Sequence, residues 1–372
     1  MKKILISHSN NIEYDEDTVR FNGKEVADYE DMSPKEYAYD KLRKFYSTYL
    51  SNQFENLIVL TGSGSSIGIG ADTKKGKTMK ELWETVTEEI GKEEFSRFCE
   101  AIKFDESNPD LEALLSRAIS AQDFVPRNVE GMIRRIQNII KEECTLILPE
   151  NSHHELFLKK LTSRKLKYPR LKIFTLNYDT LFEQAASRCG YTIIDGFSYS
   201  FPRRFNGKYF DYDIVVRENS RIKTEENYAP RVFHLYKPHG SLDWEREGEF
   251  IKKSENPSNP VMIFPQYSKF ESSYEQPFFE MIARFQQALR RENVLLICIG
   301  FSFYDKHISS IIHEALDINN SVTLLVVTLD IDKNPSLERL RQKAEKNNNV
   351  ILIEEKFKDF VENYPFIELY GE

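Results

Sequence analysis

The chain has 372 residues, of which 40% are hydrophobic and 30% charged, and its formal net charge is −8. That length is compatible with one large core or with two smaller ones. The acidic balance gives no electrostatic reason to expect a general or sequence-specific nucleic-acid surface, which needs clustered Lys and Arg to displace counterions, although a local basic patch stays open.

Residues 1–50 are predicted to form a small appendage ahead of the core. Asn22-Gly23 stands between β-prone residues and indicates a β-hairpin. Ser33, Pro34 and Glu36 follow the order of an N-cap, a first-turn proline and a capping-box acid, so a helix is expected to begin there. We expect the core domain to occupy residues 51–372.

Short apolar runs recur along that domain and predict its strands. Most are apolar at consecutive positions, which is typical of strands covered on both faces in a parallel sheet. Segments with helical spacing lie between them, as in Phe278–Leu289 and Ile308–Leu316. The alternation predicts an α/β fold with a doubly wound, Rossmann-like parallel sheet. The predicted strands are Leu57–Leu60, Leu171–Leu176, Val232–Leu235, Val294–Ile299, Val322–Leu329 and Val350–Ile353.

Two insertions interrupt this alternation. Residues from about 78 to 162 have a helical pattern throughout and predict a helical insertion that covers one side of the binding edge of the sheet. Residues from about 197 to 231 are polar and rich in aromatic side chains, and Asn206-Gly207 predicts a hairpin or an extended loop there.

The sequence gives no signal for secretion, for membrane insertion or for a structural metal. The apolar run near the amino terminus ends within a few residues, too soon for a secretory signal, and no segment approaches the ~20 apolar residues of a spanning helix. A cytoplasmic protein without membrane association is therefore expected. The four cysteines form no C-x-x-C pair, so neither a structural zinc site nor a disulfide framework is expected.

The first core strand ends abruptly in a loop rich in glycine and serine, Thr61-Gly62-Ser63-Gly64-Ser65-Ser66. This loop lies at the carboxyl edge of the predicted sheet, where open α/β folds bind ligands. Glycines allow a pyrophosphate to approach the backbone, and exposed amides supply positive potential. The alternative is a tight strand-to-helix connection that holds no ligand.

Three further stretches place polar groups just after a predicted strand. They are residues 175–179 (TLNYD), 237–244 (KPHGSLDW) and 300–305 (GFSFYD). Because the carboxyl ends of parallel strands meet at one edge of a sheet, all of these groups are expected to converge on one crevice.

In this order the four stretches resemble the sirtuin family. Thr61–Gly64 matches the Thr-Gly-Ala-Gly loop of that family, and 175–179 matches its Thr-Gln-Asn-Ile-Asp stretch. His239-Gly240 matches its His-Gly pair, and Gly300-Phe301-Ser302 matches its Gly-Thr-Ser stretch. The resemblance implies a sirtuin-like fold that uses NAD as its substrate.

The resemblance also implies roles for individual residues. His239 would act as general base, at the ribose or on water, a role that suits histidine because its ordinary pKa lies near working pH. Asn177 and Asp179 would hold the nicotinamide side of NAD and its ribose, and the Asn177 amide would orient the ribose or an attacking water. Independently of the resemblance, Asp330 follows the predicted strand Val322–Leu329, a position that suits either binding of the adenosine ribose or an ordinary turn acid. The other implied NAD-binding residues are Thr61, Gly62, Ser63, Gly64, Ser65, Ser66, Gly300 and Ser302.

The chain departs from classical sirtuin deacylases in two places. After the glycine loop it reads GIGAD over 68–72, which lacks the Pro, Phe and Arg of their Gly-Ile-Pro-Asp-Phe-Arg signature. Between Gly240 and Ile299, where they carry four zinc cysteines, this chain has Cys298 alone. No zinc module is expected, which argues against protein deacylation.

A zinc-free, sirtuin-like core with a helical insertion and a late Gly-Phe-Ser-Phe-Tyr-Asp stretch resembles the bacterial antiphage-defence branch of the family. Proteins of that branch hydrolyse NAD to ADP-ribose and nicotinamide and so deplete the infected cell of NAD. The chain length resembles most the partner of a HerA-type DNA-translocating ATPase, which implies that ATPase as a partner and a homo-oligomer. An NAD-dependent protein deacylase and a non-catalytic NAD- or ADP-ribose-binding scaffold are the alternatives.

Several of these residues also have purely structural interpretations. Asn177 alone would be read as a helix N-cap, and Ser302 with Asp305 forms an S-x-x-D capping-box pattern that is compatible with phosphate binding at the same helix start. His153-His154 suggests a metal site, but Ser152 and Glu155 around the pair favour a capping box and a structural role. Residues 74–77 (KKGK) are either a solvated loop or a phosphate clamp.

Overall fold

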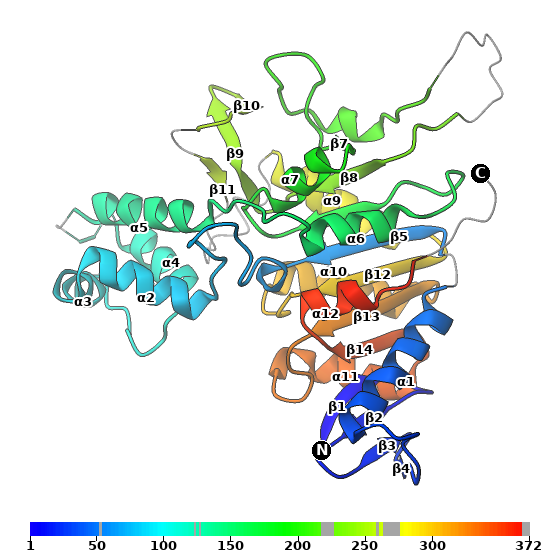
Figure 1. The fold of residues 1–372 in the computed structure, drawn as a ribbon. Coiled ribbons are helices and arrows are strands. Elements are labelled where there is room, and N and C mark those ends of the chain that lie inside the picture. The colour runs from blue at the N-terminus through cyan, green and yellow to red at the C-terminus, as the bar shows by residue number, and fades with distance from the viewer. Residues whose placement is uncertain are drawn as a thin grey trace.

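The computed structural model of the protein describes residues 1–51, 54–122, 124–125, 128–216, 227–257, 260–262 and 276–366. Within these residues eleven strands form one large sheet (Figure 1). Their order across the sheet is β4 (Lys24–Glu25), β3 (Val19–Phe21), β2 (Ile12–Tyr14), β1 (Lys2–Ile6), β14 (Val350–Glu354), β13 (Val322–Thr328), β12 (Val294–Ile299), β5 (Asn56–Thr61), β6 (Lys172–Thr175), β8 (Val232–Tyr236) and β7 (Thr192–Ile194).

The seven strands from β14 to β7 are parallel. Six of them are the apolar runs predicted from the sequence, and each lies within one residue of its predicted bounds. The seventh, β7, was not predicted because a run of three residues is too short to show a period. From β5 the chain first builds the side of the sheet that holds β6, β8 and β7, and later the side that holds β12, β13 and β14. The order therefore reverses at β5, which places the expected binding crevice at its carboxyl end.

Helices cover both faces of the sheet. Side chains alternate from face to face along each strand, so the apolar strands contribute to a hydrophobic core on each face. In β12, Leu296 and Cys298 belong to one hydrophobic core, and Leu295 and Ile297 belong to the other. The α/β, doubly wound fold predicted from the sequence is therefore confirmed. The core that contains Leu296 is covered by α9 (Phe278–Leu289), α10 (Lys306–Ile318) and α11 (Glu338–Lys346), and the 3₁₀ turn η3 (Pro335–Leu337) precedes α11. The core that contains Leu295 is covered by α1 (Pro34–Tyr49), α6 (His153–Thr162), α7 (Leu181–Arg188) and α12 (Phe357–Asn363).

The amino-terminal segment extends the core sheet. Its predicted hairpin is confirmed, because Asn22 and Gly23, both with positive φ, form the two-residue turn between β3 and β4. The predicted helix is α1, whose N-cap Ser33 and N3 residue Glu36 form the reciprocal capping box. Since β1 pairs antiparallel with β14, this segment shares a sheet with the core, and a domain boundary at residue 50 stays a prediction.

The helical pattern over 78–162 divides into two structures. The first four helices bury Trp83, Phe95 and Ile136 in a hydrophobic core of their own, and Figure 1 shows this bundle beyond the end of the sheet. Helix α6 instead packs on the sheet against α7 and α12. The helices of the bundle are α2 (Met79–Ile90), α3 (Lys92–Ala101), α4 (Leu111–Ala121) and α5 (Val129–Cys144).

The predicted insertion at 197–231 is an irregular loop with short bridges. Asn206 does not form the turn of a hairpin but caps the 3₁₀ helix η2 (Gly207–Asp211) through its side-chain oxygen. The part from 217 to 226 lies outside the described residues. A small antiparallel sheet follows, in which β9 (Gly240–Glu247) pairs with β10 (Phe250–Lys253) and β11 (Pro260–Met262).

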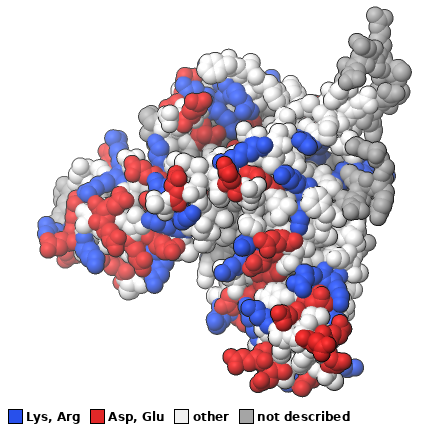
Figure 2. All heavy atoms as spheres, viewed as in Figure 1, with Lys and Arg blue, Asp and Glu red and all other residues white. Residues whose placement is uncertain are grey.

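The surface carries mixed charge. Figure 2 shows acidic and basic side chains interspersed over the face in view, with acidic ones gathered on the helical bundle. Among the described residues, no helix has both the length and the apolar character that crossing a membrane requires.

The pair His153-His154 has a structural role. His154 is fully buried, and its ring lies 4.9 Å from the ring centres of both Phe182 and Phe357. His153 points elsewhere and contacts Glu362 at 3.0 Å. Ser152 caps α6 by accepting from the Glu155 amide, so the structural interpretation of the pair is confirmed.

Burial of His154 predicts a loss of stability in acid. Desolvation lowers the pKa of this histidine from 6.5 to about 3, so between these values the unfolded chain binds a proton that the folded chain does not. Stability then falls as the pH drops below 6.5, by about 2 kcal/mol at pH 5. We expect His154→Leu to lose less stability than the wild type between pH 7 and pH 5 in urea titrations. His153→Gln is the control, and parallel pH curves for His154→Leu and the wild type would refute the expectation.

Candidate functional site

Four loops leave the carboxyl ends of adjacent parallel strands at the switch point. We name them by their residues: the glycine loop (61–66) after β5, the asparagine loop (175–180) after β6, the histidine loop (237–242) after β8, and the serine loop (300–305) after β12. The strand order β12-β5-β6-β8 makes them neighbours, as the sequence predicted.

The asparagine loop is bound to the glycine loop through Asn177. The side-chain Nδ2 group of Asn177 donates to Gly62 O at 3.0 Å, to Ser65 Oγ at 3.1 Å and to Ser66 Oγ at 2.8 Å. Ser66 Oγ in turn donates to Asp179 Oδ2 at 2.6 Å. Asn177 therefore does not cap a helix, since α7 begins at Leu181 with Thr180 at its N-cap position, and that alternative is wrong.

The histidine loop is bound to the asparagine loop by backbone and by a buried lysine. The amide of Leu242 donates to Tyr178 O at 3.0 Å. The Lys237 ammonium group donates to the carbonyls of Tyr178 and Asp179 and lies 3.1 Å from Glu183 Oε1 on α7. With its side chain only 2% exposed, Lys237 fixes one loop against the other.

The serine loop reaches the histidine loop through a carboxylate. His239 Nε2 lies 3.1 Å from Asp305 Oδ2, and both side chains are largely buried. Asp305 also caps α10, because its Oδ1 accepts from the amides of His307 and Ile308. The predicted capping box is therefore wrong in its first residue: Ser302 is exposed and three positions ahead of the cap.

The serine and glycine loops pack backbone against backbone, which closes the ring of four loops. Gly62 N donates to Ile299 O at 3.1 Å, and Gly64 N donates to Gly300 O at 3.0 Å. A Cβ on Gly62 would lie 2.6 Å from Gly300 O, and one on Gly64 would lie 2.6 Å from Gly300 Cα. Glycine is therefore required at these positions by the contact between two strand ends, whether or not a ligand binds.

Most amides of the glycine loop already bind protein acceptors. Those of Gly62, Gly64, Ser65 and Ser66 donate to backbone carbonyls of the glycine loop itself or of the β12 end. The loop continues into the single 3₁₀ turn η1 (Ser63–Ser65) and not into an α-helix, since α2 begins only at Met79. The expected positive potential of exposed amides and of a following helix start is therefore smaller here than the sequence suggested.

The side chains of the glycine loop differ in exposure. Thr61 and Ser65 are fully buried, and the Thr61 hydroxyl has no hydrogen-bond partner among the described residues. Ser63 is exposed, and Gly64 is partly exposed. Ser63 and Gly64 are thus the residues of this loop that a bound molecule can reach most directly.

A buried network of charges lies next to the histidine loop. Lys253 Nζ lies 3.0 Å from Asp195 Oδ2 and 3.0 Å from Asp243 Oδ2, and Ser241 Oγ donates to Asp243. Burial alone would raise the pKa of Asp243, but Lys253 and Lys237 hold it below its usual value. This network anchors the start of β9 directly after His239.

Sequence reasoning assigned no role to Lys237, although it begins the 237–244 stretch, and did not identify Lys253. One signal could have found Lys237: it follows Val232–Tyr236, a strand that is buried at all five positions. A lysine continuing such a strand needs a carboxylate or carbonyl partner, because an unpaired buried charge is strongly unfavourable. The partner Glu183 lies 54 residues earlier, so its identity required the structure.

The lysines of residues 74–77 fasten the loop after the glycine loop. Lys74 donates to Glu142 O, Lys75 donates to Gly70 O, and Lys77 pairs with Glu143 on α5. Lys74 and Lys75 are exposed, as expected of a solvated loop, although the ammonium group of each lysine also binds a protein partner. A pocket of about 460 Å³ lies here, lined by residues of 67–77 together with Glu81 and Glu143.

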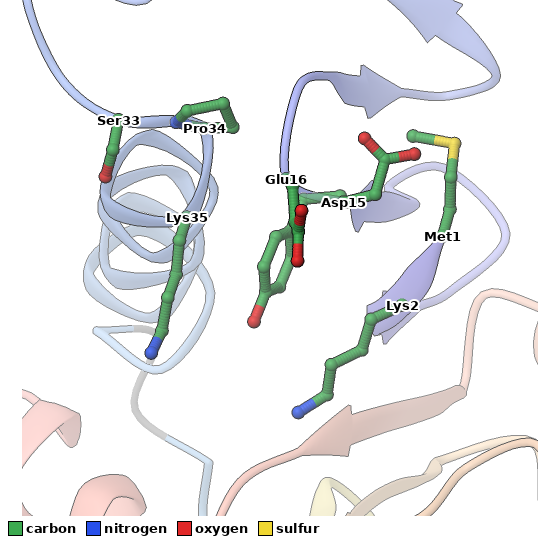
Figure 3. Close-up of a pocket in the computed structure, with 8 residues that line it drawn as sticks. Met1, Lys2, Asp15, Glu16, Ser33, Pro34 and Lys35 are labelled. Atoms are coloured by element: carbon green, nitrogen blue, oxygen red, sulfur yellow. The ribbon is translucent and has the colours of Figure 1, made fainter.

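Asp330 lies at the end of β13, two strands from β5. Its Oδ1 accepts from the Lys333 amide at 2.8 Å, which is the contact of a turn acid. A pocket of about 340 Å³ farther along the sheet lies between the start of β1, residues 14–16 and the start of α1 (Figure 3). Because β1 is four strands from β5, this pocket is separate from the ring of loops.

The model of the SIR2-like domain family matches residues 171–360. The chain belongs to this family. The matched part holds Asn177, His239 and the serine loop, and it supports an NAD-related function of sirtuin type for this SIR2-like protein. A search of curated proteins finds no match. Among the described residues, no three His, Cys, Asp or Glu side chains lie together so that they could hold a metal ion.

Proposed function

We propose that this SIR2-like protein is an NAD glycohydrolase, which cleaves NAD to ADP-ribose and nicotinamide. The observation that carries the proposal is the ring of four loops at the switch point, in which Asn177 and His239 follow adjacent strands. The proposed catalytic residues are Asn177 and His239, and the proposed NAD contacts are Thr61, Gly62, Ser63, Gly64, Ser65, Ser66, Asp179, Gly300, Ser302 and Asp330.

Asn177 has the geometry to orient an oxygen of the substrate. Its Nδ2 group is held by three acceptors, which fixes the plane of the amide. Its Oδ1 accepts no hydrogen bond from any described residue, so it is available to a ribose hydroxyl or to a water. An amide dipole held in place before the reaction stabilises the oxocarbenium-like transition state without reorganising.

His239 supplies the proton acceptor in this proposal. The bond between the ribose carbon and the nicotinamide nitrogen breaks, and its electron pair leaves with nicotinamide. The oxygen of a water forms the new bond to the ribose carbon, and His239 takes the proton of that water. No redox partner and no acyl substrate are needed.

We also propose that the protein acts in antiphage defence by depleting NAD. In this proposal it forms a homo-oligomer and is activated in a complex with a HerA-type ATPase. The support is the sequence resemblance, in particular the late GFSFYD stretch and the single cysteine between Gly240 and Ile299. The measurement is co-purification of the protein with the product of a neighbouring ATPase gene, followed by size-exclusion chromatography.

The proposed reaction is tested by incubating the protein, alone and with that ATPase, with NAD and following the products by mass spectrometry. Nicotinamide and ADP-ribose are expected in the absence of any acyl peptide. Nicotinamide released only with an acetyl-lysine peptide would establish a deacylase instead. Binding of NAD without turnover under every condition would establish a scaffold.

Asn177→Ala is expected to lower kcat for NAD cleavage strongly. Asn319→Ala is its matched control, because the Asn319 side-chain amide likewise donates to more than one acceptor, the carbonyls of Leu289 and Arg291, at the opposite end of the sheet. We expect a loss of roughly 10²- to 10³-fold in kcat for Asn177→Ala, as for removal of one preorganised dipole. Equal losses in both variants would show a general folding defect and contradict the role of Asn177.

A further inference from the structure

We infer that Asp305 is a positioning residue that sets the proton position of His239. This inference rests on the proposed function, in which His239 is the proton acceptor. The sequence suggested only a capping role for Asp305, and the structure gives its two carboxylate oxygens different partners.

The first oxygen of Asp305 fixes the carboxylate to the helix. Oδ1 accepts from His307 N at 2.9 Å and from Ile308 N at 3.3 Å, two amides of the first turn of α10. Helix α10 is itself fixed, because Ile308 and Ile312 are buried in the core under β12. The carboxylate therefore has little freedom to turn.

The second oxygen of Asp305 faces the imidazole. Oδ2 lies 3.1 Å from His239 Nε2, and the side chains are only 10% and 15% exposed. An ionised carboxylate can only accept a hydrogen bond, so neutral His239 carries its proton on Nε2. Nδ1 is then left with the lone pair that takes a proton from water.

The histidine loop has its own reason to keep His239 in place. Gly240 has a φ of 90°, and a Cβ there would lie 2.1 Å from Val261 O on β11. The backbone next to His239 is therefore packed against β11, while Asp305 holds the ring. Backbone and side chain of the proposed base are fixed by different elements.

Asp305→Asn separates the two functions of this carboxylate. Asn is as good an N-cap as Asp, so its side-chain oxygen can still accept from His307 and Ile308. Its Nδ2 then takes the place of Oδ2 and presents a donor to His239 Nε2, which moves the ring proton to Nδ1. The start of α10 is kept, and only the proton position changes.

The expected result is a fall in kcat of roughly 10²- to 10⁴-fold with KM for NAD little changed, since the proton acceptor is lost and NAD contacts are not. Asn128→Ala, which removes the N-cap of α5 in the helical bundle, is the control and should keep kcat within about twofold while lowering stability. A kcat of Asp305→Asn within twofold of the wild type would overturn the inference.

A second measurement is independent of turnover. In ¹⁵N-histidine-labelled protein at pH 8, with the His239 signal assigned through His239→Gln, long-range ¹H–¹⁵N NMR reports which ring nitrogen carries the proton. We expect Nε2 in the wild type and Nδ1 in Asp305→Asn. An unchanged His239 spectrum in Asp305→Asn would overturn the inference, whereas absent NAD turnover with the expected spectra would overturn only the proposed function.

Discussion

His239→Ala is expected to abolish nicotinamide release while NAD still binds. Loss of a positioned general base lowers kcat by roughly 10²- to 10⁴-fold. Binding should persist because the other three loops remain joined by the contacts of Asn177 and of Gly300. The measurement is nicotinamide release by mass spectrometry together with the Kd for NAD by calorimetry.

The matched control for His239→Ala is His8→Ala. His8 lies near the amino terminus, is exposed, and its Nδ1 contacts Glu345 O on α11 at 2.9 Å. Its removal should leave both kcat and Kd unchanged. Full turnover by His239→Ala would exclude this histidine as the base, and a loss of NAD binding in His239→Ala would assign it to binding.

Lys237→Met is expected to have the largest effect on stability. It removes the partner of Glu183, whose pKa is raised by burial, and leaves the carbonyls of Tyr178 and Asp179 without their donor. Removing one member of a buried ion pair destabilises by about 3–5 kcal/mol. The measurement is the free energy of unfolding from denaturant titration.

Two further variants check the reason for that loss. Lys252→Met removes a lysine from ion pairs with Glu245 and Glu247 at the surface and should destabilise by about 1 kcal/mol or less. In the double variant Lys237→Met/Glu183→Gln no unpaired charge is left, so part of the stability should return. If Lys237→Met and Lys252→Met cost the same, Lys237 is not the anchor of the asparagine loop.

The strands and the order of the loops could be predicted from the sequence, because both depend on local patterns. Runs such as Val294–Ile299 are apolar at every position, since each face of the sheet is covered by helices. The convergence of the glycine, asparagine, histidine and serine loops then followed from the rule for parallel strands.

The contacts inside the ring could not be predicted, because they join residues far apart in the chain. Gly64 contacts Gly300, and Lys237 contacts Glu183. These residues are so far apart in the sequence that the hydrophobic periodicity of helices and strands gives no sign of the contacts. In the serine loop, too, the sequence did not predict which residue caps the helix. Ser302 and Asp305 match a capping box by spacing, yet the carboxylate of Asp305 takes the cap and faces His239. Whether Ser302 or Asp305 caps the helix was decided by tertiary packing, which local spacing does not report.

The two outer strands of the large sheet, among the described residues, limit how a strand of another chain can pair with it. On one side the sheet ends in β4, which has two residues, and on the other in β7, which has three. Edges this short offer few free backbone groups for a strand from another molecule. The homo-oligomer proposed above is therefore expected to be held by side chains on helices and loops and not by continuation of the sheet from one copy to the next.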